Sequence, residues 1–311
     1  MRTPGLLRCG LFCLLGFMAV SIMAGVFVAE GALHPGRRSL SADEESRARK
    51  MAERQDSDLA DVAIAARDRV TLRVWSVRPR NSNEKAVILL HGVSDNRSGM
   101  IGYAELFLGH GFSVLLPDAR AHGASGGRLA TYGLLESEDI RRWFDWVERQ
   151  QHTECIFGFG ASMGAAELLQ SQEPGFCAIA AESPFSSFRE VAYDRVGQFF
   201  HAGHWLGRTI LRTVVEAAFG YARWKYELDF EQASPETTVA ATRVPVLLIH
   251  GQNDGNIPVR HSRRIKALNP AVMLWEVSNT DHCGAISTAR QELERRLVGW
   301  FDRHSVKHGT H

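Results

Sequence analysis

A serine between two glycines is the first candidate for chemistry in this chain. Gly160-Ala161-Ser162-Met163-Gly164 matches the pattern G-x-S-x-G. This pattern presents a serine hydroxyl for nucleophilic attack when a strand precedes it and a helix follows. The apolar run at residues 155–159 predicts the strand, and residues 163–170 predict the helix. Because the glycines leave room for a sharp turn, Ser162 is the predicted nucleophile.

A second stretch fits the same pattern, so the pattern alone is weak evidence. It reads Gly123-Ala124-Ser125-Gly126-Gly127, and Arg128 follows it. These residues predict a loop with no helix start after the serine. Ser125 is therefore interpreted as a loop residue.

A serine nucleophile needs a base, and the base needs an acid that orients it. Asp254 follows an apolar run at residues 246–249, and the turn at residues 255–258 would expose it. His282 follows the last apolar run, at residues 272–277. The order serine, acid, histidine therefore predicts Asp254 as the acid and His282 as the base. Glu182, which ends the run at residues 177–181, is the alternative acid.

An acyl-transfer site also needs two N–H donors for the oxyanion. The residue after the nucleophile supplies one from the start of its helix, so Met163 is the first candidate. The other is expected from the loop after the strand that ends at His91-Gly92, and Val93 is the best candidate there. Since both donors belong to the backbone, side-chain identity at these positions is only loosely constrained.

Alternating apolar runs and helical segments predict the elements that position these residues. Strands are predicted at residues 70–77, 86–90, 112–116, 155–159, 177–181, 246–249 and 272–277. Helices are predicted at residues 99–109, 132–149, 163–171, 260–268 and 285–303. This alternation is typical of an α/β fold with a parallel sheet covered on both faces.

One insertion interrupts the alternation. Residues 186–241 contain no convincing strand but many aromatic residues, and we expect two or three helices there. The functional interpretation is a lid over a pocket, and the structural alternative is plain packing against the sheet.

The N-terminus is expected to contact a membrane. A basic segment, residues 1–8, precedes 21 uncharged residues at positions 9–29. A helix of that length spans roughly 30 Å, the thickness of a bilayer's hydrocarbon core. A single-pass anchor is the preferred interpretation and a cleaved signal peptide the alternative. Arginines flank the run on both sides, so the positive-inside rule does not orient it, and the likeness to a signal favours a body outside the cytoplasm.

The rest of the chain divides into three segments. Residues 30–64 are expected to form a polar spacer, and residues 39–60 within it predict a solvated helix, too poor in apolar positions for a coiled coil. Residues 65–305 form the predicted catalytic domain, and residues 306–311 form a tail. Cys155, Cys177 and Cys283 show no pairing pattern.

Composition excludes several classes of protein. The chain has 311 residues, of which 45% are hydrophobic and 23% charged, with a formal net charge of +1. These values fit a globular domain and give no reason to expect a nucleic-acid partner. We expect no metal, since His201 and His204 have no acidic or cysteine companions, and no other cofactor. The oligomeric state is left open.

Taken together, the segments resemble the α/β-hydrolase superfamily, over about residues 65–305. The first matching segments are His91-Gly92-Val-Ser-Asp-Asn-Arg97 and Asp118-Ala-Arg-Ala-His-Gly-Ala-Ser-Gly126. The others are Gly160–Gly164, His250-Gly-Gln-Asn-Asp254 and Asp281-His282. Within the superfamily the chain resembles the serine aminopeptidase and esterase-like group, whose first loop reads HGxxxNR.

The resemblance implies a mostly parallel eight-stranded sheet, acyl transfer to water and no cofactor. It also implies that Asn96 and Arg97 brace the first loop, and that Asp118, Arg120 and His122 brace the next. Ala121 departs from the glycine that is common in related chains.

The expected function is hydrolysis of a carboxylic ester, with a small-molecule or lipid-like acyl substrate. A peptidase or amidase that acts on small substrates is the alternative within the same fold. A membrane-tethered binding module without catalysis is the alternative of another class.

Overall fold

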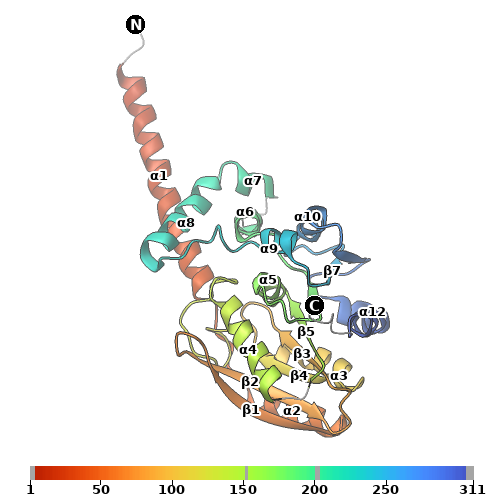
Figure 1. The fold of residues 1–311 in the computed structure, drawn as a ribbon. Coiled ribbons are helices and arrows are strands. Elements are labelled where there is room, and N and C mark those ends of the chain that lie inside the picture. The colour runs from red at the N-terminus through yellow and green to blue at the C-terminus, as the bar shows by residue number, and fades with distance from the viewer. Residues whose placement is uncertain (1–3, 151–152, 200–203, 306–311) are drawn as a thin grey trace. The chain divides into compact units, whose positions relative to one another are not determined.

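The computed structural model describes residues 4–150, 153–199 and 204–305. Residues up to His34 and Phe188–Gln232 form one compact unit, here called the helical unit. Pro35–Ser187 and Ala233 onward form the other, here called the hydrolase unit. Figure 1 shows the elements of both units. The tail at residues 306–311 and His201 lie outside the described residues.

The hydrolase unit contains an eight-stranded sheet in the order β1-β2-β4-β3-β5-β6-β7-β8. The strands are β1 Ser57–Ala65, β2 Thr71–Pro79, β3 Lys85–Leu90, β4 Ser113–Pro117, β5 Cys155–Ala161, β6 Ala178–Glu182, β7 Val246–Gly251 and β8 Met273–Val277. β2 pairs antiparallel with β1 and β4, whereas all pairs from β4 to β8 are parallel. The predicted α/β fold with a mostly parallel sheet is confirmed.

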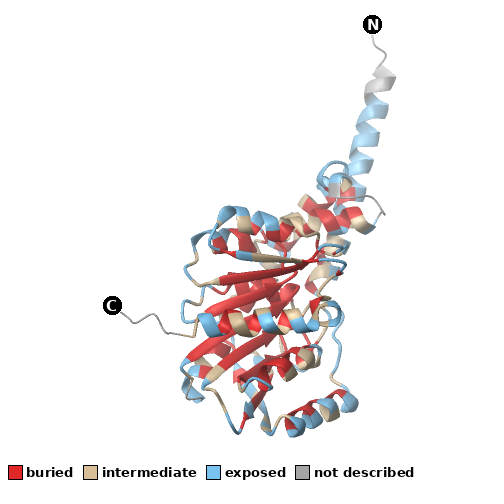
Figure 2. Cartoon of the chain, turned by 90° about the vertical axis from the view of Figure 1, so that its right-hand side faces the viewer, coloured by how far each residue is buried: buried red, intermediate tan, exposed pale blue. Residues whose placement is uncertain are grey.

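Helices cover both faces of the sheet because successive side chains of a buried strand point to opposite sides. In β3, Val87 and Leu89 pack on one face, and Ile88 and Leu90 pack on the other. The first face carries α2 Ala42–Arg54, α3 Ile101–Leu108 and α12 Arg290–Arg303. The second carries α4 Glu136–Gln150, α5 Met163–Gln170, α9 Pro235–Ala241 and α10 Arg260–Leu268. Figure 2 shows the buried strands between the helices.

The helix predicted within residues 39–60 is present as α2, but this segment is not a solvated spacer. α2 buries Ala48, Met51 and Ala52 against the sheet, and Ser41 begins it with a capping box to Glu44. β1 then pairs along its whole length with β2. The prediction was wrong because an edge strand is half exposed, so its sequence resembles a polar linker.

Two predicted helices have different bounds in the structure. The helix expected at residues 132–149 begins only at Glu136. The helix expected at residues 285–303 is divided into α11 Ala285–Thr288 and α12, with Ala289 between them. Neither change alters the strands that carry the predicted site.

The helical unit contains α1 Pro4–Leu33, α6 Phe188–Phe199, α7 His204–Arg208 and α8 Arg212–Tyr226. Its aromatic side chains pack on one another: the Phe188 ring stacks on Phe230 and Phe219 at centroid distances of 4.6 and 6.1 Å. The insertion expected at residues 186–241 is therefore divided. α9 belongs to the hydrolase unit, where Val239 is part of the core.

Within the described part of the chain, α1 is the one helix long and apolar enough to cross a membrane. The qualifying segment, Arg8–Leu33, lies near the N-terminus. A signal sequence meets the same criterion, so length and composition by themselves leave both interpretations open.

Cys155 and Cys177 form a disulfide with a Cα–Cα distance of 5.8 Å. No pattern in the sequence indicated this pairing, because the residues are 22 positions apart and only sheet formation makes them neighbours. Cys155 begins β5, and Cys177 immediately precedes the adjacent β6. Cys9, Cys13 and Cys283 are free thiols.

Candidate active site

Ser162 lies in the sharp turn between β5 and α5. Its backbone has φ 54° and ψ −114°, a strained conformation for a residue with a side chain. Both glycines of the motif are required, because neighbouring backbone atoms leave no room for a side chain at either position. A Cβ on Gly160 would lie 2.5 Å from the Gly164 carbonyl oxygen, and one on Gly164 would lie 2.6 Å from the His91 carbonyl oxygen.

The structure brings together the three side chains predicted for catalysis. The His282 Nε2 atom lies 2.8 Å from the Ser162 hydroxyl, and its Nδ1 atom lies 2.8 Å from an Asp254 carboxylate oxygen. Ser162, Asp254 and His282 follow β5, β7 and β8 respectively. Since these strands are parallel, their carboxyl ends meet at one edge of the sheet, where ligand sites of open α/β sheets lie.

The Asp254 side chain is fully buried, yet several hydrogen-bond donors contact its carboxylate. Burial raises its pKa, but hydrogen bonds outweigh burial and hold the pKa below the usual range. The donors include His250, His282 and the backbone N–H of Ile257. The carboxylate is therefore ionised at neutral pH, the state that holds an imidazole in one tautomer.

Glu182, the alternative acid, contacts other groups. Its carboxylate accepts hydrogen bonds from the Tyr103 hydroxyl at 2.6 Å and from the Ala285 backbone N–H at 3.0 Å. Burial raises its pKa above the usual value. The imidazole of His282 is hydrogen-bonded to Asp254 and not to Glu182.

The backbone segments that carry the predicted oxyanion donors lie near Ser162. Met163 is the first residue of α5, where backbone N–H groups have no acceptor within the helix. The loop that contains Val93 passes close to Ser162, because a Cβ on Gly92 would lie 3.4 Å from the Ser162 Cβ. Both backbone segments therefore border the hydroxyl.

The loop after β3 is braced as the resemblance implied. Asn96 accepts a hydrogen bond from the Ser98 N–H and so begins the short 3-10 helix η1, Arg97–Met100. The Arg97 guanidinium lies over the Trp75 ring and bonds Asp61 at 3.1 Å. Asp118 accepts from the Arg97 backbone N–H at 2.7 Å. This network fixes the loop that carries Val93.

The loop after β4 is braced by buried polar groups. The Arg120 guanidinium binds Asp139 through two hydrogen bonds of 2.7 Å. His122 bonds the Arg120 carbonyl oxygen, and burial lowers the histidine pKa to about 4. Ser125 donates to the Asp118 carbonyl oxygen and accepts from the Arg73 N–H. Ser125 is thus a buried structural residue, as interpreted from its loop.

A model of the Alpha/beta hydrolase family matches residues 87–296, a span that includes all three side chains. The chain belongs to this family. The matched span exceeds half of the chain and runs from β3 through β8 into α12.

Among relatives of this alpha/beta hydrolase, the uncharacterized protein YqkD of Bacillus subtilis is 26% identical over 238 residues. The alignment covers 74% of this chain and 75% of YqkD. The uncharacterized protein YfhR of Escherichia coli is 24% identical over 248 residues, with 76% of this chain and 78% of YfhR covered.

Solved structures share the fold. The Pyrococcus furiosus esterase Pf2001 superposes with a TM-score of 0.69 at 23% identity, covering 88% of this chain and 100% of the esterase. The Pyrococcus horikoshii acylaminoacyl peptidase superposes with a TM-score of 0.62 at 15% identity, covering 82% of this chain but 43% of the peptidase.

Two positioning residues of this alpha/beta hydrolase were missed by sequence reasoning. His250 lies 3.3 Å from the Asp254 carboxylate and is itself held by the Ser262 hydroxyl. Gly251 lets the loops of Asp254 and His282 meet, because a Cβ there would lie 2.3 Å from the Thr280 carbonyl oxygen. The sequence signal was the dipeptide His250-Gly251 at the end of a strand, a repeat of His91-Gly92.

A cavity of about 890 Å³ lies away from these side chains. It is lined by Glu154 and Pro245, which precede β5 and β7, so it opens at the amino ends of the strands. Within the described residues, no cluster of three or more histidine, cysteine or acidic side chains could hold a metal ion. The hydrogen-bonded residues at the carboxyl edge are therefore the candidate active site.

Proposed function

We propose that this alpha/beta hydrolase is a membrane-anchored serine hydrolase that cleaves carboxylic esters through an acyl-enzyme. One observation carries the proposal. A continuous chain of hydrogen bonds runs from the Ser162 hydroxyl through His282 to the buried carboxylate of Asp254. A base within 2.8 Å of the hydroxyl can take its proton as the nucleophile attacks.

The first half of the reaction acylates Ser162. Its Oγ atom forms a bond to the acyl carbon while His282 Nε2 takes the hydroxyl proton, and Asp254 stabilises the resulting imidazolium. The backbone N–H groups of Val93 and Met163 would bind the oxyanion. His282 then gives the proton to the leaving alkoxide oxygen as the ester bond breaks.

The second half releases the acid. A water molecule attacks the acyl carbon while His282 takes one of its protons. The bond to Ser162 then breaks, and the proton passes from His282 to the serine oxygen. The free enzyme and a carboxylic acid result, and no cofactor is consumed.

Ester cleavage is the preferred reaction because the fold of this chain covers 100% of the esterase Pf2001. The same fold covers 43% of the acylaminoacyl peptidase. The loop His91–Arg97 supports placement in the serine aminopeptidase and esterase-like group with an HGxxxNR first loop. A peptidase or amidase remains the alternative within this fold.

The membrane part of the proposal rests on α1. Its residues 9–29 would serve as a retained single-pass anchor. The disulfide between Cys155 and Cys177 supports a body outside the cytoplasm, because disulfides persist in oxidising compartments. A lipid-like or otherwise hydrophobic acyl group suits an enzyme held at a bilayer. The proposed lid is the part of the insertion that belongs to the helical unit, Phe188–Gln232, which lies between β6 and β7 in the chain.

Labelling with a fluorophosphonate tests the nucleophile. We expect the full chain to be labelled and Ser162→Ala to be unlabelled at equal folded concentration. Ser125→Ala is the matched control, because Ser125 lies in the second G-x-S-x-G match and we expect it to keep its label. Equal labelling of the wild type and Ser162→Ala would contradict the assignment.

A substrate series tests the reaction. The full chain is assayed in detergent with p-nitrophenyl esters from C2 to C16 and with aminoacyl p-nitroanilides, with Ser162→Ala as the blank. We expect kcat/KM to be at least about 100-fold higher for the best ester. A preference for anilides would favour the peptidase. No turnover of either class by folded protein would favour a binding module.

A further inference from the structure

The second half of α1 is a packed part of the helical unit. Ser21, Gly25 and Ala29 recur at intervals of four residues and form a buried stripe on α1. The Ser21 hydroxyl bonds the Thr213 hydroxyl at 2.9 Å. A Cβ on Gly25 would lie 2.7 Å from the Ala217 Cβ, so backbone approaches backbone there as in close helix pairs within membranes.

A polar cluster fixes the other end of this contact. The Glu30 carboxylate accepts hydrogen bonds from the hydroxyls of Tyr221 and Tyr226 and from the Lys225 ammonium, at 2.6 to 2.8 Å. Ser21 thus pairs with the start of α8, and Glu30 pairs with its end. The two helices therefore run in the same direction, and α1 leaves the unit at the start of α8.

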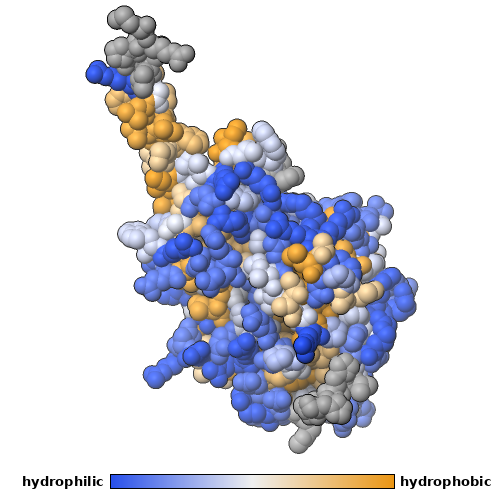
Figure 3. All heavy atoms as spheres, turned by 45° about the horizontal axis from the view of Figure 1, so that its top comes forward, coloured by the Kyte–Doolittle hydropathy of each residue, from blue (hydrophilic) through white to orange (hydrophobic). Residues whose placement is uncertain are grey.

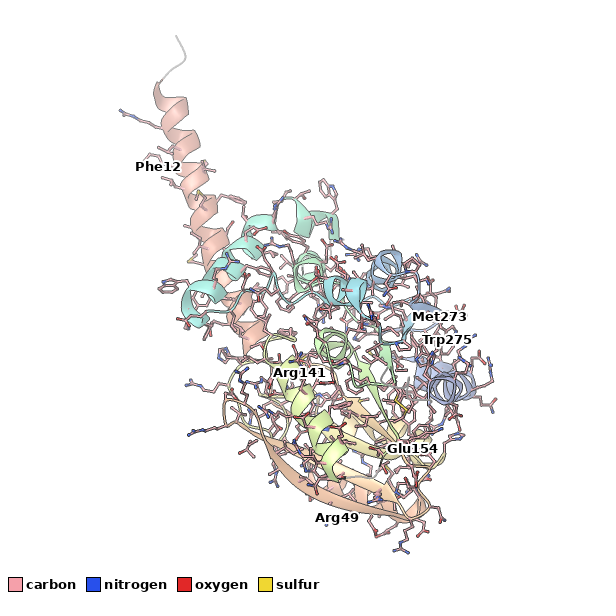
Figure 4. All side chains as sticks on the ribbon, viewed as in Figure 1. Phe12, Arg49, Arg141, Glu154, Met273 and Trp275 are labelled. Carbon is pink, nitrogen blue, oxygen red and sulfur yellow. A yellow bond between two sulfur atoms is a disulfide. The ribbon has the colours of Figure 1, made fainter. Side chains whose placement is uncertain are left out.

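The part of α1 that protrudes is too short to cross a bilayer. Arg8–Val20 is exposed throughout, and 12 of its residues, 9–20, carry no charge. Twelve helical residues extend about 18 Å, whereas the hydrocarbon core is about 30 Å thick. Figure 3 shows this segment as a continuous hydrophobic surface, and Figure 4 shows Phe12 projecting from it. The remaining length of about 12 Å must come from local thinning of the bilayer or from immersion of the unit.

Exposed apolar side chains lie where α1 leaves the unit. Ile210, in the turn three residues before Thr213, is 56% exposed, and Trp205 in α7 is 66% exposed. The turn is tied to α7, because the Leu211 N–H donates to the Leu206 carbonyl oxygen at 3.0 Å. Tryptophan is favoured at the headgroup level of a membrane, where its ring is half apolar and its N–H is solvated.

We infer that this end of the helical unit is a membrane-docking surface whose partner is the lipid bilayer. Trp205 and Ile210 enter the interfacial layer beside α1, and the unit supplies the depth that α1 lacks. Trp224, on the last turn of α8 near Glu30, stays in water. The inference rests on the proposed membrane anchor, but not on the proposed ester chemistry.

Fluorescence quenching by brominated lipid tests the surface. The full chain is reconstituted into vesicles of phosphatidylcholine that is brominated at positions 6 and 7 of one acyl chain. α1 contains no tryptophan, and Trp205 and Trp224 are the two exposed tryptophans of seven in the chain. We expect Trp205→Phe to lose at least about half of the lipid quenching and Trp224→Phe to keep it. Aqueous iodide should show the reverse order.

A flotation assay distinguishes an error in the proposed docking surface from an error in the proposed membrane anchor. If the protein floats with vesicles after carbonate extraction but Trp205→Phe leaves lipid quenching unchanged, the docking surface is wrong and the anchor stands. If the chain does not float, both are wrong. Fluorophosphonate labelling of Ser162 in the same samples reports the hydrolase chemistry independently.

Discussion

The Glu182 carboxylate accepts a hydrogen bond from the Ala285 backbone N–H at 3.0 Å and thereby ties the end of β6 to the loop that carries His282. The neighbouring Ser183 hydroxyl accepts from the Cys283 N–H at 3.3 Å. Burial also raises the pKa of the Cys283 thiol, which makes it a poor rival nucleophile. Glu182 at the end of β6 and Ser183 just after it therefore hold the loop of His282 close to Ser162.

Replacement of Asp254 or Glu182 by the corresponding amide distinguishes the roles of the two carboxylates. We expect Asp254→Asn to lower kcat by about 10³- to 10⁴-fold, because the amide no longer holds the correct imidazole tautomer. Glu182→Gln keeps an oxygen acceptor for Ala285 and should lower kcat less than about tenfold. Ester hydrolysis at saturating substrate measures both, and a larger loss for Glu182→Gln would reverse the assignment of the acid.

We expect the space beside Ser162 to limit which side chains can replace Gly92 without loss of activity. A Cβ there meets the Ser162 Cβ at 3.4 Å, an ordinary contact, so Gly92→Ala should be tolerated. The branches of Gly92→Val would crowd the hydroxyl and the N–H of Val93, and we expect a loss of at least about tenfold in kcat/KM. The rate of fluorophosphonate labelling measures the effect, and equal rates for the two variants would contradict it.

We expect packing between α1 and α8 to protect the helical unit from proteolysis. Gly25→Leu places side-chain atoms into the Ala217 contact and the adjacent backbone, so α8 should separate from α1. Gly16→Leu is the matched control, since a Cβ there meets nothing within 4 Å. Limited trypsin digestion in detergent should cleave within α8 at least about fivefold faster in Gly25→Leu. The same rate in both variants would show that the contact contributes little.

Acid should destabilise the hydrolase unit through its buried histidines. Burial lowers the pKa of His122 from 6.5 to about 4 and lowers that of His91 as well. Between pH 6.5 and 4 the unfolded chain therefore binds more protons than the folded chain, so the free energy of unfolding falls as the pH falls. Each such histidine contributes a slope of up to about 1.4 kcal/mol per pH unit.

Urea unfolding at pH 7.5 and pH 5 measures this slope. His122→Gln, whose amide can still bond the Arg120 carbonyl oxygen, should be less sensitive to pH than the wild type. An unchanged difference between the two pH values would show that His122 does not carry the effect.

The disulfide between Cys155 and Cys177 predicts how many thiols react before and after reduction. Without reduction, a thiol-reactive polyethylene glycol should modify Cys9, Cys13 and Cys283 in the denatured chain, and after reduction it should also modify Cys155 and Cys177. Loss of the disulfide in Cys155→Ser with Cys177→Ser should lower the free energy of unfolding by about 3 kcal/mol. Five reactive thiols before reduction, in protein purified without a reductant, would contradict the pairing.

Sequence analysis identified the features of this protein that depend on neighbouring residues in the chain. A strand, a glycine-bounded serine and a helix follow one another at residues 155–170, so the turn at Ser162 could be predicted from neighbours alone. Asp254 and His282 were found because each follows an apolar strand closely. Periodicity and turn residues carry such information over about ten positions.

Features that depend on pairing between distant segments became visible only in the folded chain. Register in the sheet placed Cys155 beside Cys177 and made residues 57–64, an expected spacer, part of β1. It also placed Glu182 against the histidine loop instead of the imidazole. Folding also packed half of the apolar N-terminal helix against α8, and no hydropathy pattern within residues 9–29 could predict this contact. Such contacts depend on which surfaces meet after folding, and the chain encodes them only through the packing of the whole molecule.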